Sequence, residues 1–172
     1  MPDYRATRLP LGIILGILLS FTLAWAFSGW SGIQTALSLF LSNPIAGLYN
    51  YVSRIFSADI DLIGLIINPP ADIVLFLTGL FSSNMFAWII TAGIAACIAK
   101  GLRRGLTASI IVYVIDLLIW ILIGILSGED LLAMFSGDSL LVSIGTILGG
   151  LAGVLIGGSL FGLASGPSEG IL

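Results

Sequence analysis

The sequence has very little charge. Only 9% of its 172 residues are charged, whereas 58% are hydrophobic, and the mean hydropathy is +1.17. A water-soluble domain usually carries about 25% charged residues, so this chain has too few to cover a surface in water. Histidine is absent and cysteine occurs once, which excludes His-rich metal sites, disulfide frameworks and Cys-clustered metal centres. We therefore expect neither a metal nor another cofactor, and the net charge of −3 argues against nucleic acid as a partner.

Long apolar runs predict an all-α polytopic membrane protein. A spanning helix needs about 20 mostly apolar residues, and four segments approach that requirement. We expect transmembrane helices at 11–28, 85–100, 106–126 and 140–164, all within a single membrane domain, 1–172. The string Ala24-Trp25-Ala26 imitates a signal-peptide cleavage site, but we expect the first segment to stay attached as a span.

The few charges predict how these spans are oriented. Basic residues gather before the first span and around the 101–105 loop: Arg5, Arg8, Lys100, Arg103 and Arg104. The positive-inside rule assigns that side to the cytoplasm. Six acids fall on the other side, three of them in or beside the outer loop 127–139: Asp59, Asp61, Asp72, Glu129, Asp130 and Asp138. We expect a cell-membrane protein with its N-terminal segment 1–10 and C-terminal segment 165–172 in the cytoplasm.

The segment 29–84 is apolar but interrupted. Two Asn-Pro strings divide it, Asn43-Pro44 and Asn68-Pro69-Pro70. Each predicts a helix start, with Asn as the N-cap and Pro in the first turn. We expect short helices over 44–56 and 69–81 that lie at the outer interface or form a re-entrant hairpin.

A six-span alternative treats 31–56 and 59–82 as two further transmembrane helices, each broken at its Asn-Pro string. It would bring Asn68, two prolines and Asp72 close to the middle of the bilayer. An aspartate at the centre of a spanning helix alone costs about 3 kcal/mol. Four spans are therefore favoured over six.

Small residues recur at every fourth position in the first and last spans. The repeats are Gly12, Gly16, Ser20 and Ala24 in the first, and Gly145, Gly149, Gly153 and Gly157 in the last, with a second set at Gly158 and Gly162. Such Gly-x-x-x-Gly faces let two helix backbones approach closely. The pattern predicts tight helix packing, within one chain, between subunits of an oligomer, or both. A glycine-lined pore is a third interpretation.

Asp116 is the one ionisable residue deep in any of the four predicted spans. An intramembrane carboxyl group is a candidate functional site by default. Tyr113 and Trp120 share its helix face and could donate hydrogen bonds to it, and counting from the turns puts Thr91 at the same depth. One hypothesis is a protonated acid that relays protons or a monovalent cation. The other is a neutral acid that joins helices through hydrogen bonds.

Enzymatic chemistry has little support in the sequence. Within the predicted spans there is no histidine, no carboxylate pair within one turn and no phosphate-binding glycine loop. The sequence favours a non-catalytic membrane subunit that packs in a homo-oligomer or a larger membrane complex. The alternative is a small ion- or proton-coupled transporter or channel that uses Asp116. The predicted partners are the lipid bilayer and other membrane subunits or further copies of this chain.

Overall fold

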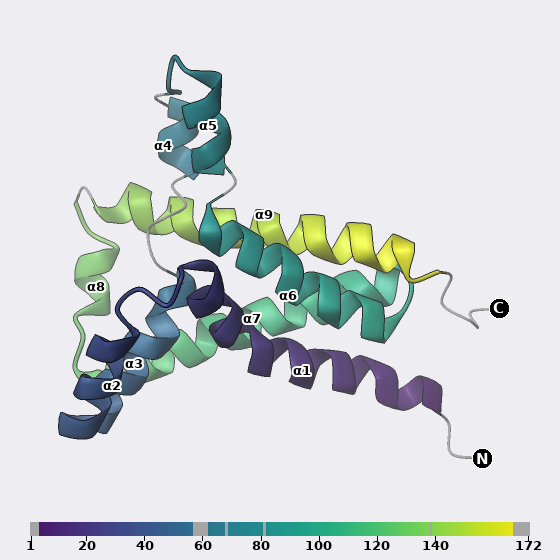
Figure 1. Ribbon diagram of the computed structural model, residues 1–172, viewed down its shortest axis with the longest axis horizontal. Helices are drawn as coiled ribbons and strands as arrows, with labels where there is room; N and C mark the ends of the chain where they lie inside the picture. The colour runs from purple at the N-terminus through teal and green to yellow at the C-terminus, as the bar shows by residue number, and fades with distance from the viewer. Residues whose placement is uncertain (1–3, 57–61, 68, 81, 138, 167–172) are drawn as a thin grey trace.

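Four long helices form the body of the protein. The computed structural model describes residues 4–56, 62–67, 69–80, 82–137 and 139–166, and its regular elements there are all helical. The four helices run in alternating directions along the long axis (Figure 1): α1 (Tyr4–Phe27), α6 (Ser83–Ala99), α7 (Leu102–Ser127) and α9 (Ser139–Ala164). Three of them, α1, α7 and α9, are long and apolar enough to cross a membrane, whereas α6 has 17 residues. This composition is consistent with a multi-pass membrane protein.

The small residues of α1 lie against the centre of the bundle. Both α1 and α9 contact α6 as well as α7. A methyl group added at Gly12 would lie 2.7 Å from the carbonyl oxygen of Ala95, and one at Gly16 would lie 2.6 Å from Cγ2 of Val112. Ser20 and Ala24, further along the same face, are fully buried. The predicted small-residue face of the first span therefore packs within the chain.

The glycines of α9 from Gly150 to Gly162 face α6 and α7 of the same chain. A methyl group at Gly157 would collide with the carbonyl oxygen of Ile89, and one at Gly153 would lie 3.0 Å from the carbonyl oxygen of Met85. All the predicted positions are buried: Gly145, Gly149, Gly153, Gly157, Gly158 and Gly162. A side chain at most of these sites would push α9 away, so glycine is what permits the short distance between helices.

Aromatic rings fill the bundle toward the end where α6 begins. Phe56 lies 5.2 Å from Trp120 and 5.6 Å from Trp88, measured between ring centroids. Trp88 makes an edge-to-face contact with Tyr113 at 4.8 Å. Both tryptophans, Phe56 and Tyr113 are buried. These large rings compensate for the small side chains elsewhere and fix the depth of the helices relative to one another.

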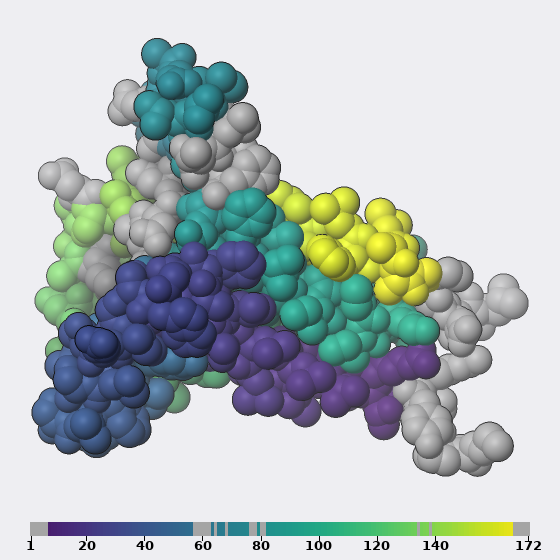
Figure 2. Space-filling view, in the orientation of Figure 1, coloured from purple at the N-terminus to yellow at the C-terminus, as the bar shows by residue number. Residues whose placement is uncertain are grey.

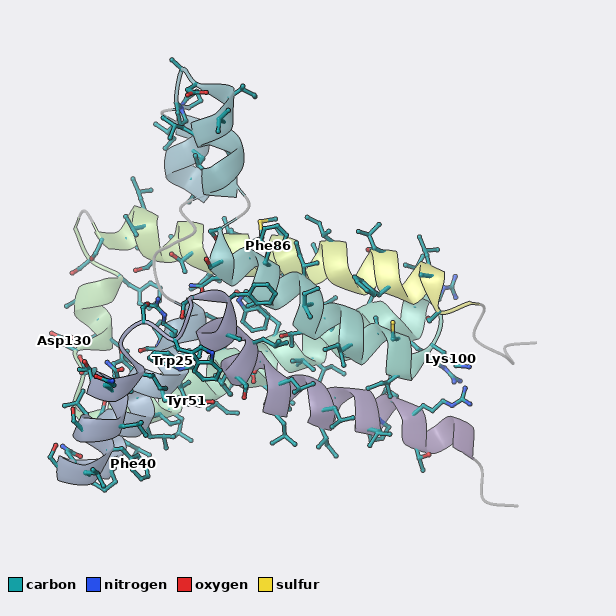
Figure 3. The ribbon with its side chains drawn as sticks, viewed as in Figure 1. Trp25, Phe40, Tyr51, Phe86, Lys100 and Asp130 are labelled. Atoms are coloured by element: carbon teal, nitrogen blue, oxygen red, sulfur yellow. The ribbon has the colours of Figure 1, made fainter. Side chains whose placement is uncertain are left out.

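Opposite charges lie at opposite ends of the bundle. The α6–α7 turn consists of Lys100 and Gly101, both with positive φ (55° and 85°), and the Gly101 N–H donates to Oγ of Ser165 at 3.1 Å. Figure 3 shows Lys100 at this end and Asp130 at the other. The start of α1 and the end of α9 also lie at the Lys100 end (Figure 1). The predicted clustering of the basic residues at one end is present in the fold.

The predicted break at Asn43 is confirmed. α2 (Ile33–Ser42) and α3 (Pro44–Ser53) pack against each other on either side of it, followed by the 3-10 turn η1 (Arg54–Phe56). The side-chain oxygen of Asn43 accepts a hydrogen bond from the Ala46 N–H at 3.3 Å, and Pro44 occupies the first turn. Gly47 lets α3 approach the backbone of Phe40. The helix N-cap and the proline thus act as the sequence indicated.

The second predicted helix start is wrong by several residues. α4 (Leu62–Ile67) and α5 (Ile73–Leu80) form a hairpin, and Pro69 and Pro70 lie in its loop rather than in the first turn of α5. The N-cap is Asp72, whose Oδ1 accepts from the Val74 N–H at 2.8 Å. Because a proline disfavours helical geometry in the residue before it, tandem prolines delay the start until Asp72 can cap. Asn68, the expected cap, lies outside the described residues, as do Asp59, Asp61 and Asp138.

The α4–α5 hairpin projects from the side of the bundle near the start of α9 (Figures 1 and 2). It contacts the bundle mainly through α4 and α9. The short helix α8 (Leu131–Met134), capped by the side chain of Asp130, follows α7 at the same end of the molecule. All helices outside the four-helix body are therefore gathered at the end away from Lys100.

Candidate functional site

Asp116 lies on α7 and is completely buried, with no exposed surface. It lies about 21 Å from the start of α7 and about 17 Å from its end at 1.5 Å per residue. The helices α1, α3, α6 and α9 all contact α7. The carboxyl group therefore lies near the middle of α7 and inside the bundle.

Helix register places Ser20 of α1 at the height of Asp116. Gly16 of α1 meets Val112 of α7, and one turn further along both helices Ser20 and Asp116 face each other, because residues four apart share a face. Both have no exposed surface, and we call them the Asp116 layer. Thr91 is also buried but does not lie at this height. The α6–α7 contacts pair Ala96 with Gly105 and Ala92 with Ser109, which puts Thr91 nearer the α6–α7 turn and corrects the predicted depth.

The polar groups of the Asp116 layer are only partly satisfied. Neither carboxyl oxygen of Asp116 has a hydrogen-bond partner in the described part of the chain. The Ser20 hydroxyl lies beside the Asp116 carboxyl group but donates to the carbonyl oxygen of Ile17 at 2.9 Å. Buried polar groups are nearly always paired, so the layer holds unused capacity to bind a proton, a cation or water.

No described basic side chain balances the charge of Asp116. Arg54 stacks over the ring of Trp25, while Lys100 and Arg103 are exposed in and beside the α6–α7 turn. An unpaired carboxylate in an apolar interior is strongly disfavoured. The arrangement therefore suits a neutral carboxylic acid, or a carboxylate that forms only when a cation enters the layer.

Tyr113 does not donate to Asp116, which corrects one expectation. Its hydroxyl donates to the carbonyl oxygen of Ile147 on α9 at 2.6 Å, because the ring packs edge-on against Trp88 and points toward α9. Trp120, the other expected donor, has no partner for its Nε1 among the described residues. Of the predicted site residues, Tyr113 bonds to α9 and Thr91 lies nearer the α6–α7 turn than Asp116 does.

Ser20 belongs to the Asp116 layer, although it was not predicted from the sequence as a site residue. The sequence placed Ser20 among the small packing residues of the first span, which it also is. The available signal was its polarity, because Ser20 is the one hydroxyl residue in the Gly12–Ala24 repeat. Within the described ranges, no three His, Cys, Asp or Glu side chains gather as a metal site would require.

Fold and site together define an all-helical chain with three helices long and apolar enough to cross a membrane, packed with α6 around a buried carboxyl group. Comparison with family models, curated proteins and solved structures returned no match.

Proposed function

We propose that this chain is a non-catalytic integral membrane protein in which the Asp116 layer binds a proton or a monovalent cation during transport. The observation that carries the proposal is the fully buried carboxyl group whose two oxygens lack hydrogen-bond partners among the described residues. Intramembrane acids are costly and are typical of proton and ion pathways. An acid that served only to join helices would be expected to use its oxygens in hydrogen bonds.

The packing favours the transport interpretation over the subunit interpretation that the sequence favoured. The small-residue faces of α1 and α9 were the main argument for an interface with another subunit. Six of their glycines lie in close contact with α6 or α7 of the same chain, so the spacing of these six is accounted for without a partner: Gly12, Gly16, Gly153, Gly157, Gly158 and Gly162. The buried acid has only Ser20 of α1 beside it, and both its oxygens lack a hydrogen-bond partner among the described residues.

Four spans, with α6 as the fourth, are the topology that we propose. Although α6 has 17 residues and is about 25 Å long at 1.5 Å per residue, it lies between three longer apolar helices. By contrast, α2 and α3 have 10 residues each and turn back on themselves at Asn43. Helices of that length are about 15 Å long, half the thickness of the hydrocarbon core. We propose that they lie at the outer interface, with both termini and Lys100 in the cytoplasm.

Thiol labelling tests this topology. In a Cys97→Ala background, which removes the one native cysteine, Arg103→Cys and Glu129→Cys introduce single thiols at opposite ends of α7. In intact cells, a membrane-impermeant reagent is expected to label the position-129 variant and to label the position-103 variant only after lysis. Labelling of both variants, or of neither, in intact cells would contradict the proposed topology.

Proton flux into liposomes tests the function. The wild-type protein is expected to dissipate an imposed pH gradient, with or without a monovalent cation gradient, and Asp116→Asn is expected to abolish that flux. Asp130→Asn is the matched control, because it makes the same change at an exposed helix cap. If Asp116→Asn carried the wild-type flux at every pH, the proposed role of Asp116 would be wrong.

One observation supports a second candidate function, that of a subunit in an oligomer or a larger membrane complex. The α4–α5 hairpin stands away from the bundle, and most of its described exposed side chains are apolar, including Ile66 (75% exposed) and Ile73 (66%), with Asp72 as the charged exception. Such a surface is covered by lipid or by another protein. Purification in a mild detergent distinguishes the two candidate functions. A stoichiometric partner would favour a complex subunit, whereas a chain that purifies alone and carries flux would favour a transporter.

A further inference from the structure

Arg54 is the only basic residue of the chain that lies away from the Lys100 end. Of the other five, Lys100 lies in the α6–α7 turn, Arg103 and Arg104 follow it, and Arg5 and Arg8 occupy the start of α1. Arg54 begins η1 and is partly buried where α1 ends. Its guanidinium carbon lies 5.7 Å from the ring centroid of Trp25, and Nη2 donates to Oγ of Ser31 at 3.1 Å. These contacts hold the cation in one position.

The guanidinium group retains unused hydrogen-bonding capacity. Its Nε is buried and has no hydrogen-bond partner among the described residues, although arginine carries five N–H donors. A buried donor without a partner is costly. The Nη2 end of the guanidinium fork is exposed. A ligand with acceptor oxygens would meet this end in the geometry that arginine uses for carboxylates and phosphates.

A polar cavity of about 290 Å³ adjoins Arg54. Its walls include the indole of Trp25, three hydroxyl groups and one amide, from Ser31, Thr35, Ser53 and Asn50. No acidic side chain lines it, so Arg54 supplies the only formal charge. A cavity with one fixed cation and several neutral donors favours a small anionic group.

An apolar groove of about 270 Å³ lies on the same pair of helices, α2 and α3. Ile33, Leu37, Phe40 and Tyr51 are among the residues that line it. The ring of Tyr51 stacks on Trp25 at 6.0 Å, and the Trp25 Nε1–H donates to the Tyr51 carbonyl oxygen at 3.1 Å. Trp25 and Tyr51 lie side by side at the end of α1, with Phe40 further out (Figure 3). These two rings thus connect the polar cavity to the groove.

We propose that the α2–α3 region binds one anionic phospholipid, with the phosphate in the Arg54 cavity and an acyl chain along the Phe40 groove. The juxtaposition carries the proposal: a fixed cation with a free donor, neutral donors around it, and an apolar channel that begins at the same aromatic pair. The groove residues Leu37 and Phe40 are about half exposed, as a lipid-facing surface requires. This site is separate from the Asp116 layer and does not depend on transport.

Lipid retention by the purified full-length protein tests the site. Protein in detergent is mixed with phosphatidylglycerol and phosphatidylcholine of identical acyl chains, and the lipid that remains bound is measured by native mass spectrometry. Wild-type protein is expected to retain the anionic lipid in about tenfold preference, the scale of one charge-assisted ion pair. Arg54→Gln is expected to lose that preference. Arg103→Gln, which removes an exposed cation at the opposite end, is expected to keep it.

Two further arms separate the lipid from a free anion and cover a variant that does not fold. Phosphatidylglycerol is expected to raise the thermal midpoint of the wild-type protein, and millimolar inorganic phosphate is not. Phe40→Ala, on the exposed groove, is expected to lower retention of both lipids while helix content is unchanged. Equal retention by Arg54→Gln and wild type would overturn the proposal, as would equal stabilisation by inorganic phosphate or wild-type retention by Phe40→Ala.

Discussion

A single methyl group at position 157 should force α9 away from α6. The added carbon of Gly157→Ala would meet the backbone carbonyl of Ile89, and a backbone atom inside a helix cannot rotate aside as a side chain can. Overpacking of this kind costs about 1–3 kcal/mol, and the rigid neighbour argues for the upper value. Alanine recovers about 1 kcal/mol of helix propensity relative to glycine. We expect a net loss of about 2 kcal/mol.

The assay is unfolding of the purified protein in mixed micelles with a rising fraction of a denaturing detergent, followed by circular dichroism. Gly162→Ala should lose less stability than Gly157→Ala, because its added carbon would lie 3.2 Å from the nearest atom, Cα of Leu102, and would not collide with the backbone. Ala164→Leu adds bulk at an exposed position of α9 and should be close to neutral. If Gly157→Ala were as stable as the wild type, the close α6–α9 approach and the reasoning from it would be refuted.

Three further predictions concern single polar groups. Ser109→Ala removes a buried hydroxyl that donates to a backbone carbonyl of α6 at 2.9 Å and should destabilise the protein by about 1 kcal/mol, measured in the same unfolding assay. Tyr113→Phe keeps the ring but removes the 2.6 Å bond to α9, with an expected loss of about 1 kcal/mol; an unchanged midpoint would show that the bond contributes nothing. Burial, reinforced by the negative charge of Glu129, raises the pKa of Tyr49 on α3. The stability that the neutral Tyr49 hydroxyl contributes is fully present below about pH 10 and is lost as the pH rises through the raised pKa. Tyr49→Phe should therefore reduce the fall in thermal midpoint that alkaline pH causes.

Sequence reasoning worked where one physical constraint dominated. The need for about 20 apolar residues per span located three of the helices that can cross a membrane, although α1 and α7 begin several residues earlier than expected. The four-residue period of Gly12, Gly16 and Ser20 identified the face of α1 that packs inward. The Asn43-Pro44 string gave the N-cap and the first turn of α3, because capping depends on a few adjacent residues.

Features that depend on distant contacts could not be predicted in the same way. The direction of the Tyr113 hydroxyl depends on Trp88 and on the backbone of α9. A shared helix face was therefore not enough to predict a hydrogen bond between Tyr113 and Asp116. The proximity of Ser20 to Asp116 depends on the register between α1 and α7. That Arg54 lies over Trp25, beside a cavity, follows from how α2 and α3 fold back, which the apolar 29–84 segment did not reveal.

The central claim is that protons reach and leave the buried carboxyl group of Asp116. A hydrophobic carbodiimide modifies protonated carboxyl groups within a membrane, so mass spectrometry of protein labelled in liposomes reads this property directly. We expect one modified site in the spans, Asp116, with labelling that falls as pH rises and that a transported monovalent cation suppresses. An Asp116 that stayed unlabelled at every pH, or was labelled at a rate independent of pH and cations, would contradict the account and leave the carboxyl group a sealed structural contact.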